Sequence, residues 1–404
     1  MESRVSPSIA LLVSIACILI LLRLKVHPGA AVFAGSVALA LMVLPTIETP
    51  RLMLSTITSL QTIRLIGIII CALTLSKLME IRGLLVKLAH TLESVGPKMA
   101  MHVVPSVIGM VPMPGGALVS ATALKDLARR LDLTPAQSTY INFWFRHTWE
   151  LSVPVYPAVI AASVVLAVPL STVVTIMLPA IPLMALLGGV VSYRILKDKT
   201  SEATSALSGR ELIDDLLRAA WPVLLLVALV LAGMEAAFAF LIAGVILALQ
   251  QRASRAEILQ SLRYGLGPKV LFLLYSVMLY KAIVEQSGAA YALFADMQSI
   301  GMPPSLILIF LPMLIGFATG LSMAFVGISF TLLLPFMMAG GELNGAALFL
   351  AYLGGGLGYM VSPLHLCLIL SAEFFGARLS DVYRYMVPPL IAVVLVGLLV
   401  YTLA

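Results

Sequence analysis

Three ionisable side chains lie close together inside one long apolar segment of the sequence. Arg146, His147 and Glu150 all fall within residues 138–165, shortly before Pro154. A charge in the middle of a membrane segment costs about 3 kcal/mol on insertion scales, so such charges mark binding sites and proton pathways. We interpret Arg146 as a clamp for a substrate carboxylate, and Glu150 or His147 as a site of proton exchange.

Other interpretations of these three residues stay open. Arg146 and Glu150 are four residues apart, so on one helix they would share a face and neutralise each other. If the pair opens when the substrate binds, Arg146 and Glu150 can neutralise each other in the empty protein and still act on the substrate. His147 alone could be an ordinary packing residue. The spacing of His147 and Glu150 would also suit a metal pair, but the sequence lacks a second such pair, so it predicts no metal site.

The same segment is too long to be one straight spanning helix. As a single helix, residues 138–165 would extend about 42 Å, whereas the apolar core of a bilayer is about 30 Å thick. Pro154 and Pro157 remove backbone donors, so we predict a broken helix. Freed carbonyl groups can coordinate a cation and helix N-termini can bind an anion. Asn142 and Ser152 would add neutral ligands to this site.

A second apolar segment, residues 101–123, is interrupted by the run Pro112 to Gly116. Each arm of about 11 residues would reach about 16 Å, half of a bilayer, so we expect a re-entrant hairpin rather than a kinked spanning helix. Glycine lets a backbone approach a ligand closely, and amides at a buried tip need partners. The binding candidates in this hairpin are Pro114, Gly115, Gly116 and Ser120.

The second half of the chain contains a matching pair of segments. Residues 304–337 are predicted to form another hairpin, with Thr319, Gly320 and Ser322 as binding candidates, although small residues equally suit close helix packing. In residues 346–372, four glycines from Gly354 to Gly358 disfavour a helix by roughly 1 kcal/mol each, and we predict a break at Val361-Ser362-Pro363, which corresponds to Ser152-Val153-Pro154 in the first half. Two candidates follow these glycines, Ser362 as a substrate ligand and His365 as a proton site.

Composition places these motifs in a membrane protein. The 404 residues are 61% hydrophobic and 11% charged, with a mean hydropathy of +1.08, whereas soluble domains are about 25% charged. The formal charge of +6 reports membrane topology rather than a nucleic-acid partner. The cysteines lie in apolar runs without metal-ligand spacing, so they predict neither a disulfide framework nor a zinc site. They are Cys17, Cys71 and Cys367.

The distribution of basic residues supports an all-α fold with about ten spanning helices and two re-entrant hairpins. With both hairpins re-entrant, 19 of the 25 basic residues fall on one side and three on the other. That bias follows the positive-inside rule and puts both termini outside the cytoplasm. Lys77 and Lys281 lie near helix ends, where they either snorkel or face the substrate. The predicted spans are residues 7–22, 28–45, 61–79, 138–165, 169–193, 219–235, 237–250, 268–284, 346–372 and 387–403.

The chain repeats its pattern of segments in two halves. We divide it into a first repeat at residues 1–195, a cytoplasmic connector at 196–218 and a second repeat at 219–404. Five crossings in each half make the second repeat inverted relative to the first. Inverted repeats with interrupted helices indicate a secondary transporter whose site lies at the repeat interface.

The motifs Met113-Pro114-Gly115-Gly116-Ala117 and Gly358 to His365 carry a resemblance to a known group. The chain resembles an uncharacterised prokaryotic integral-membrane family within the ion transporter superfamily, across nearly its whole length. More distantly, it is similar to gluconate permeases, citrate carriers and divalent-anion/sodium symporters. That likeness implies a homodimer with a fixed scaffold and a moving, hairpin-bearing transport domain. The Ser-Asn-Thr motifs of the symporters are absent, so their sodium and carboxylate ligands do not carry over.

From these features we predict a secondary active transporter in the cytoplasmic membrane of a prokaryote. Its substrate would be a small organic anion of the carboxylate class, coupled to protons or sodium, with no other cofactor. The alternative is a cation/proton antiporter that uses Glu150, which would tolerate neutralisation of Arg146. An intramembrane enzyme is less favoured, because only His147 and Glu150 resemble catalytic groups.

Overall fold

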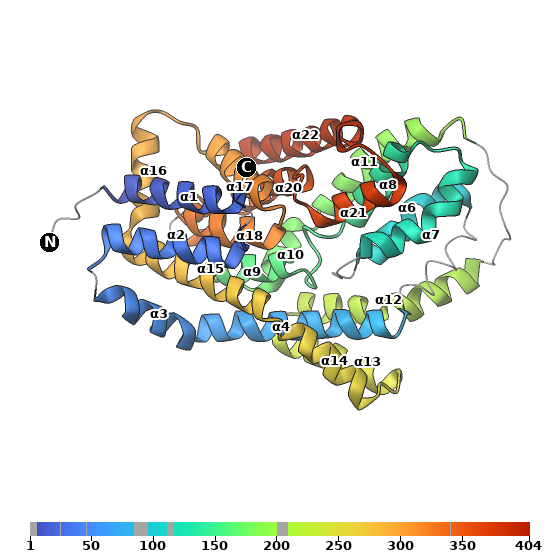
Figure 1. Ribbon diagram of the computed structural model, residues 1–404, viewed down its shortest axis with the longest axis horizontal. Coiled ribbons are helices and arrows are strands. Elements are labelled where there is room, and N and C mark those ends of the chain that lie inside the picture. The colour runs from blue at the N-terminus through green and yellow to red at the C-terminus, as the bar shows by residue number, and fades with distance from the viewer. Residues whose placement is uncertain are drawn as a thin grey trace.

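The computed structural model describes residues 6–24, 26–45, 47–84, 96–110, 116–199, 209–339 and 341–404. Over these residues the protein is mostly helical, and many of its helices run along the longest axis of the molecule (Figure 1). The described strands form one short antiparallel ribbon, in which β1 (Met338–Ala339) pairs with β2 (Glu342–Leu343). The all-α class predicted from the sequence is confirmed.

Helices in the first half begin where the sequence favours a helix start. They are α1 (Pro7–Arg23), α2 (Pro28–Val43), α3 (Glu48–Thr58), α4 (Leu60–Ile81), α6 (Pro97–Gly109), α7 (Gly116–Arg130), α8 (Pro135–Arg146), α9 (Pro157–Val165), α10 (Leu170–Met177) and α11 (Ala180–Leu196). Proline opens several of them, where its missing N–H would have no helical partner. Thr134 and Gln137 form a capping box before α8.

The second half contains a similar sequence of helices. They are α12 (Gly209–Leu231), α13 (Ala236–Gln250), α14 (Arg255–Gly265), α15 (Pro268–Ser287), α16 (Ala289–Ser299), α17 (Pro304–Thr319), α18 (Ser322–Phe325), a π-helical turn (Val326–Phe330), α19 (Thr331–Met337), α20 (Gly345–Met360), α21 (Leu366–Phe375) and α22 (Leu379–Leu403). Ser254 and Glu257 cap α14 in the same way as the pair before α8.

Four helical spans of the described residues are long and apolar enough to cross a membrane. Several shorter apolar helices, such as α1, α2 and α13, accompany them. Together with the composition, these spans describe a multi-pass membrane protein. The count of ten crossings and the inverted repeats stay predictions. The long spans are Leu60–Ile81, Leu170–Leu196, Arg255–Ser287 and Leu379–Leu403.

The two segments predicted as hairpins each form two helical arms. In the first, α6 and α7 pack against each other, and most of the tip between them lies outside the described residues. Helix α7 does not end at residue 123, where we placed the end of the hairpin, but continues through the basic stretch to Arg130. It does so because Leu124 and Leu127 are buried while Lys125 and Arg129 are exposed. In the second hairpin, α17 ends at Gly320, whose φ of +65° is suited to glycine.

Both long apolar segments with internal prolines are interrupted. Residues 147–156 separate α8 from α9, and residues 361–365 separate α20 from α21. We call these segments the first break and the second break. The first break begins well before Pro154, at the end of α8. Ser106 of α6 donates to the carbonyl oxygen of Phe145 at 3.1 Å, so the neighbouring arm supplies a partner to that carbonyl.

The predicted break at Val361-Ser362-Pro363 lies within the observed second break, but the glycines before it do not interrupt the helix. Helix α20 stays regular through Gly354 and Gly358, and it ends only at Met360. These glycines instead allow close packing of α20 on α17. A Cβ on Gly354 would lie 2.7 Å from the carbonyl oxygen of Ile309, and one on Gly358 would overlap the carbonyl of Met313. Tertiary packing therefore outweighs the low helix propensity of glycine.

Candidate substrate site

A cavity of about 400 Å³ lies where the two breaks approach each other. The turn between α17 and α18 closes one part of its wall, and α2, α4, α14 and α15 contribute the rest. The site candidates from the sequence that line this cavity are Arg146, His147, Glu150, Gly320, Ser322 and His365. Residues far apart in the chain therefore meet at one place, as expected for a site between two broken helices.

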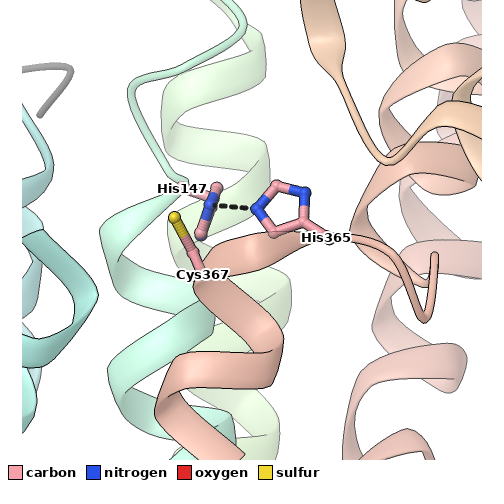
Figure 2. A group of neighbouring side chains, drawn as sticks. All are labelled: His147, His365 and Cys367. Carbon is pink, nitrogen blue, oxygen red and sulfur yellow. Dashed lines mark hydrogen bonds between the residues drawn. The ribbon is translucent and has the colours of Figure 1, made fainter. Parts of the chain in front are cut away.

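A pair of buried histidines joins the two breaks. Nε2 of His147 lies 3.1 Å from Nε2 of His365 (Figure 2). Nδ1 of His147 lies 2.6 Å from the carbonyl oxygen of Phe143. A carbonyl can only accept, so this nitrogen carries a proton. In the neutral imidazole, the lone pair on Nε2 of His147 is therefore available to His365.

Glu150 connects the first break to the second hairpin. Its Oε1 accepts a hydrogen bond from the Ser322 hydroxyl at 2.7 Å. Its Oε2 lies 3.6 Å from Nε2 of His147, and the side chain is 13% exposed. The carboxylate is thus held between the hairpin turn and the histidine pair, at the edge of the cavity.

Arg146 is the last residue of α8, and its side chain is buried. Because α8 ends there, Arg146 and Glu150 do not share one helical face, and that expectation is wrong. Both side chains nevertheless line the same cavity. The guanidinium also lies beside the thiol of Cys367, at the start of α21.

The charged groups of the cavity wall are mostly positive. Arg146 and Lys269 are cationic, whereas Glu150 is the carboxylate among the described lining residues. Lys269 belongs to the first turn of α15, and His27 at the start of α2 also lines the cavity. This balance favours a ligand that carries negative charge.

Comparison with protein families identifies the group to which the chain belongs. The profile described as "Protein of unknown function (DUF401)" matches residues 5–404. The chain is a member of the DUF401 family. No curated protein matches it. A solved structure that resembles it is the Alcanivorax borkumensis YdaH transporter, reported to have an unusual topology.

The likeness between this DUF401 protein and the YdaH transporter concerns the fold. The two share 15% sequence identity and a TM-score of 0.61, over 83% of this chain and 84% of the other. Such low identity leaves the individual site residues unassigned. The roles of the site residues in this DUF401 chain therefore rest on its own geometry.

Several predicted ligands instead bond to the protein around them. Asn142 donates to the carbonyl oxygen of Ala117 at 3.1 Å and to the Ser371 hydroxyl at 2.9 Å. Ser362 donates to the carbonyl oxygen of Phe317 at 2.6 Å, and Ser152 donates to that of Met177. The hydroxyls of Ser120 and Thr319 bond within their own helices. The candidates that bond in this way are Ser120, Asn142, Ser152, Thr319 and Ser362.

The remaining predicted residues lie away from the cavity or beyond the described part of the chain. Pro114 and Gly115 are outside the described residues, and Gly116 is buried at the start of α7. Lys77 pairs with Glu80 at 2.7 Å. Lys281 pairs with Glu285 at 3.0 Å and lines a separate, smaller cavity.

Sequence reasoning missed three DUF401 residues that the fold brings to the site. Cys367 lies with His147 and His365, and the ligand atoms of the three residues are within 4.8 Å of one another. Its sequence spacing from His147 carries no signal, because the two belong to different halves of the chain. Lys269 was counted only among the basic residues on one side of the membrane, and Tyr264 was not singled out, yet both line the cavity.

Proposed function

We propose that this DUF401 protein is a secondary active transporter for a small organic anion of the carboxylate class. The observation that carries the proposal is the cavity between the two breaks, in which Arg146 and Lys269 face a single carboxylate, that of Glu150, among the described residues. Arg146 bears a permanent charge in a largely apolar wall. A guanidinium there can hold a carboxylate through two parallel hydrogen bonds.

Protons or sodium ions would supply the driving force. Glu150, His147 and His365 are titratable groups that line the same cavity as Arg146, so proton exchange on any of them would change the charge that the anion meets. For sodium, the carbonyl groups freed in the first break offer oxygen ligands. Both options place the coupling ion in the cavity that holds the anion.

Transport would proceed by movement of the hairpins and breaks against the other helices. The cavity has one wall from the breaks and the second hairpin, and another from α2, α4, α14 and α15. A site between two such bodies can change its exposure when one slides past the other. The distant likeness to elevator-type carriers is the basis for this arrangement and for a homodimeric assembly in a prokaryotic cytoplasmic membrane. The fold shared with the YdaH transporter supports transport in general.

A cation/proton antiporter is the second candidate, and the contacts of Glu150 favour it. This carboxylate binds the hairpin through Ser322 and approaches His147, so a cation could compete for it directly. Antiport would require Glu150 and would survive loss of the charge on Arg146. Anion transport would fail when either group is neutralised.

The thermal stability of the purified protein tests the proposed substrate class. A ligand at 100 times its dissociation constant stabilises the folded state by about 2.7 kcal/mol. We expect a carboxylate to raise the melting temperature in a panel of carboxylates, sugar acids, oxyanions and cations, with and without sodium. The rise should vanish in Arg146→Gln and persist in Arg194→Gln, since Arg194 is exposed on α11 and is not part of the cavity wall. Stabilisation by cations alone, lost in Glu150→Gln, would instead support the antiporter.

A further inference from the structure

The histidine pair and Cys367 have the arrangement of metal ligands. One ligand atom from each of His147, His365 and Cys367 lies within 4.8 Å of the others (Figure 2). Two nitrogens on one tetrahedral zinc ion, each about 2.05 Å from the metal, are about 3.3 Å apart. The two Nε2 atoms are 3.1 Å apart. The pair is therefore already close to the separation that a shared ion requires.

The surrounding contacts are those that orient metal ligands in proteins. A histidine that binds a metal commonly donates its other ring N–H to a carbonyl or carboxylate. His147 does this through Nδ1 and the carbonyl oxygen of Phe143. Glu150 approaches the same Nε2 with Oε2, while Ser322 holds its Oε1. The carboxylate lies beside the three-residue cluster rather than within it, and a shift of its Oε2 toward the ion would add a fourth ligand.

The exposure of Cys367 and the negative groups near it are also compatible with a bound metal ion. Cys367 is only half-buried and lines the cavity, so an ion has a route to its sulfur. Arg146 and Lys269 oppose a cation in this cavity, whereas the Glu150 carboxylate and a Cys367 thiolate attract one. The thiolate is the form of Cys367 that would bind a metal, and binding would release its proton.

We propose that His147, His365, Cys367 and Glu150 form a binding site for a divalent transition-metal ion such as zinc. Two imidazoles, one thiolate and one carboxylate suit zinc and cobalt, whereas magnesium and calcium prefer oxygen ligands alone. The proposal concerns metal binding, so it holds whether or not the protein carries an anion.

Titration of the full-length protein with zinc and cobalt tests this site. The protein is purified in detergent, stripped with a chelator and titrated with Zn²⁺ in a calorimeter. We expect one ion per chain and, with Co²⁺, an absorption band from thiolate-to-cobalt charge transfer. Cys367→Ser should remove that band and weaken zinc binding at least about tenfold. His365→Gln should weaken zinc binding by a similar factor. Cys71→Ser is the matched control, because this half-buried cysteine of α4 is outside the cluster, and it should change neither result.

Two outcomes would overturn the proposal. One is zinc binding of equal strength in Cys367→Ser, His365→Gln and the unaltered protein, which would put the ion elsewhere. The other is cobalt binding without the thiolate band in the unaltered protein, a result that needs no folded variant. If the protein binds zinc as predicted but no carboxylate raises its melting temperature, the metal site stands and only the proposed transport function is contradicted. The two proposals can therefore fail independently.

Discussion

At the scale of single residues, backbone carbonyl groups determine which polar side chains remain available for a ligand. Helix ends leave carbonyls without a helical partner, and buried carbonyls need donors. Ser106, Ser152 and Ser362 each donate to such a carbonyl, at the C-terminal ends of α8, α10 and α17 respectively. The polar atoms left at the cavity belong mainly to ionisable side chains, which is why we place the site at Arg146, Glu150 and the histidines.

The hydrogen bond from Ser322 to Glu150 should stabilise the closed position of the second hairpin. A hydrogen bond to an ionised group contributes about 1.5–3 kcal/mol. We expect Ser322→Ala to lower the free energy of unfolding by an amount in that range. The measurement is thermal or denaturant unfolding in detergent at neutral pH, beside Ser299→Ala, whose exposed hydroxyl bonds within its own helix.

A double-mutant cycle with Glu150→Gln isolates this contact. In the Glu150→Gln background, Ser322→Ala should cost less than in the original protein. Equal losses in both backgrounds would show that the two side chains do not interact in solution, and the hairpin would then be held by other contacts.

The candidate site was only partly predictable from the sequence for the same residue-scale reason. Arg146, Glu150 and His365 stand out because ionisable groups are rare in apolar segments. Serine and asparagine do not stand out in this way. The sequence alone cannot tell whether such a side chain binds a substrate or donates to a backbone carbonyl of the protein. Cys367 gave no signal, because His147, which completes its cluster with the nearby His365, is more than two hundred residues away in the chain.

At the scale of elements, glycine sets the distance between α17 and α20. Gly316 of α17 faces the carbonyl oxygen of Gly355, which a Cβ would approach to 2.7 Å, while Gly354 and Gly358 of α20 face the backbone of α17. Such small residues let helix backbones approach closely in membranes. This packing holds the second break in position beneath the hairpin turn.

Gly358→Ala should separate these two helices. The new methyl group would overlap the carbonyl of Met313, and overpacking of a core costs about 1–3 kcal/mol. We expect a lower melting temperature and weaker binding of any ligand that the cavity holds. Gly244→Ala in α13 is the control, because no atom lies within 4 Å of its Cβ position and alanine favours helix. An unchanged melting temperature in Gly358→Ala would contradict close packing of α17 on α20.

The elements themselves were largely visible in the sequence. Hydrophobic length and proline position indicated the long apolar segments and the interruption of both, because membrane thickness and missing backbone donors act locally. Exact helix ends were not visible. Helix α8 ends at Arg146 and α20 continues through its glycines, and both outcomes depend on neighbouring helices that no local pattern reveals.

At the scale of the whole molecule, one cavity collects residues from both halves of the chain. Arg146 and Glu150 come from the first half, whereas Ser322 and His365 come from the second. Helices α2 and α15, which pack against each other (Figure 1), contribute residues to the opposite wall. A site assembled in this way changes when the two groups of helices move, and that is the property a carrier needs.

Uptake into vesicles tests the central claim most directly. The full-length protein is reconstituted into liposomes, and uptake of the carboxylate that stabilises it most is measured under an imposed proton or sodium gradient. The account predicts gradient-driven uptake that is lost in Arg146→Gln and retained in Arg194→Gln. Uptake that persists in Arg146→Gln would contradict an anion carrier centred on this cavity.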